Sequence, residues 1–286
     1  MNGAGLRRSL LAAALTLAAL SGCAHRPAKP DSSESTDRPP REAVELIRDM
    51  SFADQDLDVL LAQITLVGDA NRAVELLNAG KVQEAAKVMT PEARHAAGPG
   101  AALADARIKQ RLGDAKGAEE ALRGVLRETE IEARWRLWAA HALKRMGAKL
   151  DEDVADVLLG VVVETPGDAG LETLAIYPDL NMRYIPEDGP ILGYDPEDGR
   201  LNEAIAAIGP PAQAVYLKAP LVAEGPRPAL VKDEFRFTFL TPRGPRRVRE
   251  SLDTVNTGQY QEVFRGFANL MQTLVKLHQD AQGEQR

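Results

Sequence analysis

The sequence predicts an α+β protein in which an N-terminal array of helical hairpins precedes a small α+β domain. Apolar residues recur at helical spacing, broken by glycines, over residues 42–150. From residue 151, turn signals separate short β-rich runs, and five of the six phenylalanines lie between positions 235 and 267. We therefore place a domain boundary after Leu150 and expect a second, separate core in the C-terminal domain.

The helical hairpins are predicted from periodicity and from evenly spaced glycines. Leu57, Leu60, Leu61 and Ile64 follow helical spacing. Further along, three glycines stand 33 and 34 residues apart, where a tight turn between helices would use their left-handed conformation: Gly80, Gly113 and Gly147.

This period resembles that of tetratricopeptide-type helical repeats. Ala85 and Ala118 fit the small position of the second helix in such a repeat, whereas Ala102 and Asp105 do not match the usual first-helix residues. The resemblance implies a short tetratricopeptide-like array over residues 42–150. An ordinary helical bundle with evenly spaced turns is the alternative.

The C-terminal domain, residues 151–286, is expected to hold one mainly antiparallel sheet and two helices. The clearest strand is Phe235–Phe239, where phenylalanines alternate with polar residues and so share one face. Four earlier runs are also predicted as strands: Val157–Val163, Glu172–Tyr177, Met182–Ile185 and Pro190–Tyr194.

Two helices are predicted to complete that domain. The first, Leu201–Ile208, ends at the stop signal Gly209-Pro210-Pro211. The second covers about residues 258–281 and has one apolar stripe, which is expected to pack on the phenylalanine face of the sheet.

The segments Leu159–Glu164, Gly170–Tyr177 and Phe239–Gly244 resemble a family of uncharacterised bacterial proteins over roughly residues 157–277. The resemblance supports the domain boundary and implies no activity.

The N-terminus reads as a secretory signal. Arg7 and Arg8 form a basic start, and Leu10–Leu20 is a continuous Leu/Ala-rich stretch too short to span a bilayer. Leu20-Ser21-Gly22-Cys23 then resembles the lipobox of bacterial lipoproteins. That resemblance implies cleavage after Gly22, so that residues 1–22 are a signal peptide, and acylation of Cys23.

Residues 23–41 are predicted to be the lipidated cysteine and a disordered tether, because Ala24–Arg41 is polar and proline-rich. At roughly 3.1 Å per residue, this stretch could reach about 55 Å. The resemblance implies a periplasm-facing envelope protein held by its acyl chains. Ala24, rather than Asp, after the cysteine favours the outer over the inner membrane.

Charge and cysteine usage exclude several classes of protein. Removal of residues 1–22, which contain Arg7, Arg8 and no acidic residue, lowers the 35 basic residues to 33 against 42 acidic ones and changes the net charge from −7 to −9. A nucleic-acid partner is therefore not expected. Acylation would use the single cysteine, so no disulfide is expected either.

No catalytic, cofactor or metal motif is found, and we expect no enzyme activity, cofactor or metal. The histidines are isolated: His25, His95, His141 and His278. The turn with Asp195, Glu197 and Asp198 does not match a calcium loop, because Gly199 is fifth and Ala206 twelfth. Glu172 and Asp179 are a carboxylate pair without defined geometry.

Two clusters are candidate partner-binding residues. Trp135 and Trp138 share a helix face, which suits anchoring a partner helix or packing on the preceding hairpin. The four arginines of the second cluster suit an anionic headgroup or a charged hairpin rim: Arg243, Arg246, Arg247 and Arg249.

These observations predict a membrane-anchored envelope lipoprotein that acts as a protein-binding adaptor or assembly scaffold without catalysis. Helical-repeat arrays bind by presenting a surface. The alternatives are a C-terminal domain with a dispersed ligand-binding or enzymatic site, and a structural envelope spacer.

Overall fold

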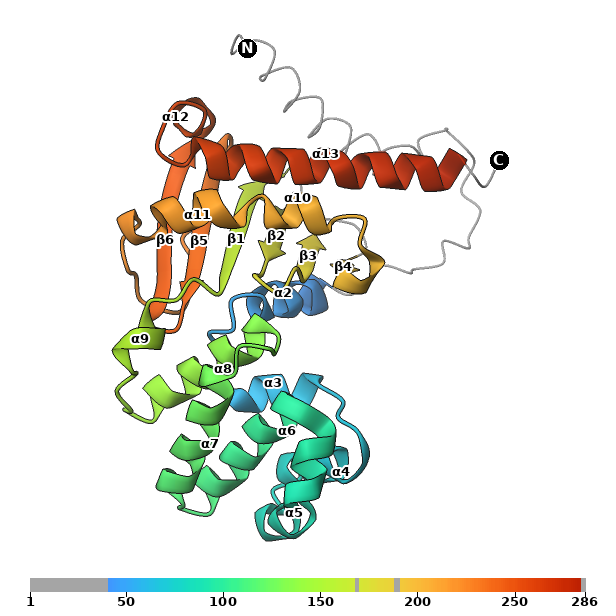
Figure 1. Ribbon diagram of the computed structural model, residues 1–286, viewed down its shortest axis with the longest axis vertical. Helices are drawn as coiled ribbons and strands as arrows, with labels where there is room; N and C mark the ends of the chain where they lie inside the picture. Colours follow the sequence, from blue (N-terminus) through green and yellow to red (C-terminus); the bar gives the residue numbers. More distant parts are fainter. Residues whose placement is uncertain (1–40, 168–169, 188–190, 284–286) are drawn as a thin grey trace.

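The computed structural model describes residues 41–167, 170–187 and 191–283. The predicted signal peptide, Cys23 and the tether lie outside these residues, except for Arg41. The described chain is a helical half followed by a half built on one sheet (Figure 1).

The helical half contains eight helices among the described residues, and consecutive helices are joined by short turns. They are α2 (Arg41–Met50), α3 (Leu57–Gln63), α4 (Gly68–Asn78), α5 (Val82–Val88), α6 (Pro91–Arg111), α7 (Ala115–Arg127), α8 (Ala133–Arg145) and α9 (Glu152–Ala155).

The predicted turn glycines adopt the left-handed conformation. Gly80, Gly113 and Gly147 have φ angles of 75°, 85° and 78°, directly after α4, α6 and α8. After Gly113, the Asp114 side chain accepts a hydrogen bond from the Gly117 backbone and caps α7. The glycines thus end three helices in the way that the sequence predicts.

One antiparallel sheet of six strands forms the other half, so the predicted α+β class is confirmed. The strands are β1 (Gly160–Pro166), β2 (Leu171–Ile176), β3 (Met182–Ile185), β4 (Leu192–Tyr194), β5 (Glu234–Thr241) and β6 (Gly244–Ser251). Their order is β4-β3-β2-β1-β5-β6. The central strand β1 places Val162 opposite both Ala175 of β2 and Thr238 of β5.

Among the described residues, five short helices or turns and one long helix complete the sheet half. Two 3₁₀ turns are η1 (Pro196–Asp198) and η2 (Tyr216–Lys218), and the α-helices are α10 (Asn202–Ala206), α11 (Gly209–Val215), α12 (Leu252–Val255) and α13 (Gln261–Gly283).

Two predictions for this half were incomplete. The arginine cluster was predicted as a possible charged hairpin rim but not as a strand; Gly244–Ser251 pairs along its full length with β5, and the two strands form a hairpin. Charged residues obscure the strand pattern there, and an edge strand tolerates them. The predicted stop at Gly209 instead begins α11, because prolines suit the first helical positions.

The phenylalanine face of the sheet packs against helices, as expected. Rings of β5 meet α13 and the residue before it: Phe235 and Phe264 pack edge-on with centroids 4.8 Å apart, and Phe239 lies 6.1 Å from Tyr260. Figure 1 shows α10, α11 and α13 along this side. A core with buried Phe237 results.

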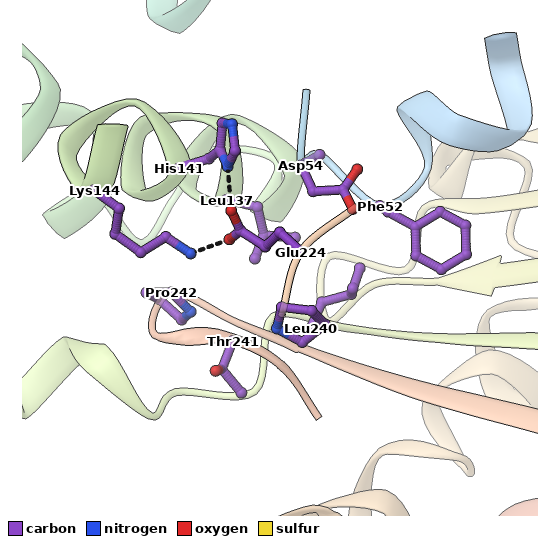
Figure 2. A pocket seen from close by; sticks show the side chains of 11 residues that line it. Phe52, Asp54, Leu137, His141, Lys144, Glu224, Leu240, Thr241 and Pro242 are labelled. Atoms are coloured by element: carbon purple, nitrogen blue, oxygen red, sulfur yellow. Dashed lines mark hydrogen bonds and ion pairs between the residues drawn. The ribbon is translucent and has the colours of Figure 1, made fainter. Parts of the chain in front are cut away.

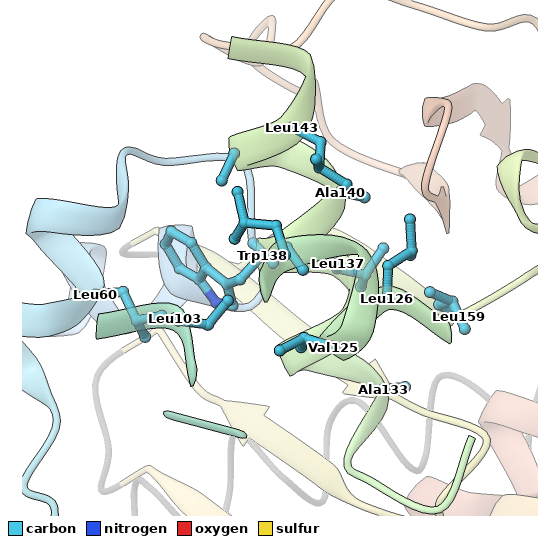
Figure 3. Close-up of a cluster of buried hydrophobic side chains, with 14 of the residues drawn as sticks. Leu60, Leu103, Val125, Leu126, Ala133, Leu137, Trp138, Ala140, Leu143 and Leu159 are labelled. Atoms are coloured by element: carbon cyan, nitrogen blue, oxygen red, sulfur yellow. The ribbon is translucent and has the colours of Figure 1, made fainter. Parts of the chain in front are cut away.

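The opposite face of the sheet packs against the helical half, and the two halves share the buried apolar cluster there. Val162, Tyr177 and Leu240 belong to the same buried cluster as Trp138 and Leu137 of α8. Figure 3 shows Leu159 of the sheet half near Leu126 and Leu137. The phenylalanine core lies within the C-terminal half, as predicted. The cluster that the two halves share on this face was not predicted, and it forms because strand alternation supplies the sheet with two apolar faces.

Candidate functional site

Beyond the shared core, the same face of the sheet becomes polar. Glu164 of β1 lies opposite Thr173 of β2 and Arg236 of β5 in one row of the sheet. All three residues are at most 1% exposed, and the Arg236 Nε donates to the Glu164 Oε2 at 2.6 Å. Burying an unpaired charge costs several kcal/mol of folding free energy, so a sheet rarely contains such a row without a reason.

Helix α2 lies beside this polar row and is bonded to it. Arg48 donates from Nε to the Thr173 hydroxyl at 3.0 Å and from Nη2 to the Leu171 carbonyl at 2.7 Å. Its Nη1 is also 2.7 Å from a carboxylate oxygen of Glu45. Two donors of Arg48 thus hold α2 to the sheet, and the third pairs within the helix.

The segment of residues 219–231, which we name the strap, runs from η2 towards β5 and reaches the helical half. Its Arg227 guanidinium lies 3.8 Å from the centre of the Phe52 ring and pairs with Asp49. The same guanidinium is 4.0 Å from Asp54 and 3.8 Å from the Oε1 of Glu164. One strap cation thus faces three carboxylates and a ring.

These elements enclose a cleft of about 470 Å³, whose walls come from α2 and the segment after it, the sheet and the strap. This volume is within the range of sites for small ligands, roughly 300–1,000 Å³. The lining residues that carry charge are Glu45, Arg48, Asp49, Asp54, Glu164, Arg227 and Arg236.

Two carboxylates of the cleft have spare capacity to accept hydrogen bonds. Within the described chain, the fully buried Oε1 of Glu164 has no hydrogen-bond partner, since the Arg227 Nε is too distant. For Asp54 the nearest described cation is the same arginine, at ion-pair distance only. Burial raises the pKa of Asp54, and Glu224 adds to the effect while Arg227 opposes it.

A second cavity of about 20 Å³ lies beside the cleft and shares Asp54 with it. Figure 2 shows Glu224 of the strap between His141 and Lys144 of α8. The His141 Nδ1 is 2.8 Å from the Glu224 Oε2, and Lys144 pairs with the other carboxylate oxygen. This cavity has room for about one water molecule, so we do not treat it as a ligand site.

Glu224 is strongly stabilised as an anion in this position. Burial would raise its pKa, but the hydrogen bonds from His141 and Lys144 outweigh that effect and lower the pKa to about 2. The Glu224 contacts therefore fasten the strap to α8.

The two candidate tryptophans, Trp135 and Trp138, both pack against the core of the helical half. Trp138 is 2% exposed and sits in the core drawn in Figure 3, and Trp135 is partly buried against the same core. This geometry fits the second interpretation of their shared face, in which the two tryptophans pack on neighbouring helices. Their role in partner binding stays a prediction.

The four arginines do not gather in one patch. Arg243 and Arg246 both bind Asp156, and Arg249 pairs with Glu234. Arg247 instead lies half-buried beside Thr238. Burial lowers its pKa most, and the nearby charges of Arg236 and Arg227 lower it further. Their binding of an anionic headgroup likewise stays a prediction.

The remaining candidates have local partners. Asp195 caps the turn at Glu197, and Asp198 binds Arg200. Asp179 accepts a hydrogen bond from the Ala133 backbone at the start of α8. Among the residues that the structure describes, no group of three or more His, Cys, Asp or Glu side chains is placed to hold a metal ion.

Sequence reasoning missed the cleft, although two signals point to it. Glu164 ends a run of valines in a buried strand, and Arg236 stands between two phenylalanines. Opposite charges inside two strands suggest that the strands are neighbours. The contribution of the strap and α2 leaves no such local signal, since these segments are about 180 residues apart.

Comparison with known proteins adds no assignment: no protein family, no curated protein and no solved structure matches the chain significantly. No helix in the described part of the chain is both long and apolar enough to cross a bilayer.

Proposed function

We propose that the chain is an envelope lipoprotein, anchored through acylated Cys23, that binds a partner protein without catalysing a reaction. The observation that carries this proposal is Leu20-Ser21-Gly22-Cys23 after a basic start and an apolar stretch. Two or three acyl chains would anchor the protein firmly, whereas one chain anchors only marginally. The tether would let the folded part stand away from the bilayer, facing the periplasm and, given Ala24, on the outer membrane.

The helical half supports partner binding. Its helices α4 to α8 pack in sequence, with left-handed glycines 33 and 34 residues apart after α4, α6 and α8. We propose that they form a short tetratricopeptide-like array, which would bind by presenting a surface rather than by supplying a catalytic group.

Metabolic labelling with an alkyne analogue of palmitate tests the anchor. The wild-type protein should be labelled and should sediment with membranes, whereas Cys23→Ser should be neither labelled nor cleaved. His25→Ala is the matched control, because it alters a neighbouring residue but leaves the lipobox intact. Equal labelling of the wild type and Cys23→Ser would refute the proposed anchor.

Crosslinking in native envelopes tests the partner. An envelope protein should crosslink to the anchored chain and be recovered in smaller amounts with Cys23→Ser, because loss of the anchor lowers the local concentration. Equal recovery of every protein with the two chains would argue against an envelope adaptor.

A second candidate function is the binding of a small molecule. It is favoured by the cleft of about 470 Å³ between the two halves, which is lined by seven charged side chains. Such a receptor would use the same anchor and tether.

A further inference from the structure

The hydrogen-bonding groups of the cleft are unevenly satisfied. The guanidinium groups of Arg48 and Arg236 both donate to acceptors within the protein. Glu164 and Asp54, in contrast, retain acceptor oxygens that no described donor reaches within hydrogen-bond distance. Among the residues that line the cleft, the unused hydrogen-bonding capacity thus lies on these two carboxylates, while a buried donor without a partner in the described chain, the Nη2 of Arg247, lies just outside the lining.

The positions of these two acceptors restrict the class of ligand that the cleft can bind. Glu164 lies on the sheet and is fully buried, while Asp54 follows α2 and its side chain is 10% exposed. Both line the cleft, and Arg227 stands between them, 3.8 Å from one carboxylate and 4.0 Å from the other. A ligand has to approach acceptors on two walls at once.

We propose that the cleft binds a small molecule that carries a primary ammonium group, with Glu164 and Asp54 as its acceptors. An ammonium group is compact and has three donors, so it can serve carboxylates on different walls. Charge-assisted hydrogen bonds of this kind are about twice as strong as neutral ones. The inference deepens the second candidate function and does not depend on the anchor.

The ion pairs around the cleft explain how the ammonium group of a ligand can bind near three arginines. Arg227 pairs with Asp49, Arg236 pairs with Glu164, and Arg48 pairs with Glu45. With these pairs formed, Asp54 is the one lining carboxylate without a close cation in the described chain, and burial disfavours its charged form; the fourth arginine nearby, Arg247, lies outside the lining. An added ammonium group offsets that charge, and the apolar Leu171 and Pro226 of the lining suit a short hydrocarbon chain.

Saturation-transfer NMR on the full-length chain in a mild detergent tests the proposal. The probe is 1,5-diaminopentane, and 1,5-pentanediol is its neutral counterpart of the same length. Saturation should pass to the diamine and not to the diol. Asp54→Asn should weaken binding of the diamine by about tenfold or more, because Asn keeps an acceptor oxygen but loses the negative charge that strengthens its hydrogen bond to an ammonium group.

Two further variants make the result specific. Asp69→Asn changes an exposed carboxylate on α4 that does not line the cleft, and should bind the diamine as the wild type does. Glu164→Gln keeps the side-chain shape and an oxygen that can accept from Arg236, and should weaken binding as Asp54→Asn does. Circular dichroism checks that each variant is folded.

The proposal is overturned if the diamine receives no saturation, if the diol receives as much, or if the folded Asp54→Asn variant binds the diamine unchanged. The last result would mean that detergent or another surface holds the probe. None of these results affects the labelling of Cys23, so a failure of this inference is distinct from a failure of the proposed anchor.

Discussion

At the scale of single residues, two glycines of the helical half allow the effect of backbone conformation on stability to be measured apart from the effect of side-chain packing. Gly113 has a φ of +85° and Gly124 lies within α7, yet a Cβ at either position would meet nothing within 4 Å. Any difference between them on substitution therefore reports the backbone alone.

We predict opposite effects for the same substitution at these two sites. Gly113→Ala should lower the free energy of unfolding by about 1–2 kcal/mol, the cost of a left-handed residue with a Cβ. Gly124→Ala should raise it by up to about 1 kcal/mol, because alanine favours a helix. Urea denaturation measures both. Changes of the same sign would contradict the assignment of Gly113 as a turn glycine.

A second prediction at this scale concerns Glu224, whose pKa falls from 4.5 to about 2 in the folded protein. A lowered folded pKa stabilises the fold above the unfolded value, and this stabilisation is lost as the pH falls from 4.5 towards 2. Glu224→Gln should therefore lower the free energy of unfolding at pH 7 by up to roughly 3 kcal/mol.

The pH dependence distinguishes this electrostatic effect from a packing defect. The deficit of Glu224→Gln relative to the wild type should shrink as denaturation is repeated below pH 4.5. Glu84→Gln, on the exposed surface of α5, is the matched control and should change little at any pH. A deficit that stays constant from pH 7 to pH 3 would show that the strap is not held by this ion pair.

At the scale of elements, the position of α13 depends on one close approach. A Cβ at Gly266 would lie 2.9 Å from the Cγ1 of Ile208, which is fully buried between α10 and α11. The glycine thus lets α13 lie near the turn that joins those helices.

Gly266→Ala should therefore destabilise the protein, although alanine is the better helix former. The overlap should cost about 1–3 kcal/mol and outweigh a gain of about 1 kcal/mol in helix propensity. Gly124→Ala, in open space, is the comparison, again by urea denaturation. A gain at position 266 equal to that at 124 would mean that α13 is not packed this closely.

Elements with a strong local pattern could be predicted from the sequence, and those without one could not. The bounds of Met182–Ile185 match β3, and the phenylalanine run marks β5, because alternation is a local property. The strand β6 was missed because adjacent arginines interrupt alternation, and the tetratricopeptide-like arrangement stays a proposal.

The cleft could not be predicted because it depends on long-range register. Glu164 meets Arg236 only through the pairing of β1 with β5, 72 residues apart. Arg227 meets Asp49 across 178 residues. No local pattern sets these distances, although a lone charge in each of two apolar strands could have suggested the first pair.

At the scale of the whole molecule, the two halves share one of three buried apolar clusters in the described chain. Val162, Ala175 and Leu240 of the sheet are buried in a single cluster with residues of α6, α7 and α8. Arg48 and the strap add polar contacts across the same boundary. If either half unfolded alone, this apolar face and these charges would lose their partners, which costs more than a small domain can usually sustain.

We therefore predict one cooperative unfolding transition for both halves. Both tryptophans are in α8, so their fluorescence reports the helical half, while exchange of β1 and β5 amides reports the sheet. Both measurements should give the same free energy of unfolding. Val162→Ala, a change in the sheet, should shift the tryptophan transition as well, by about 1–3 kcal/mol. Unfolding in two steps, with the tryptophan step unmoved by Val162→Ala, would instead show that the halves fold independently.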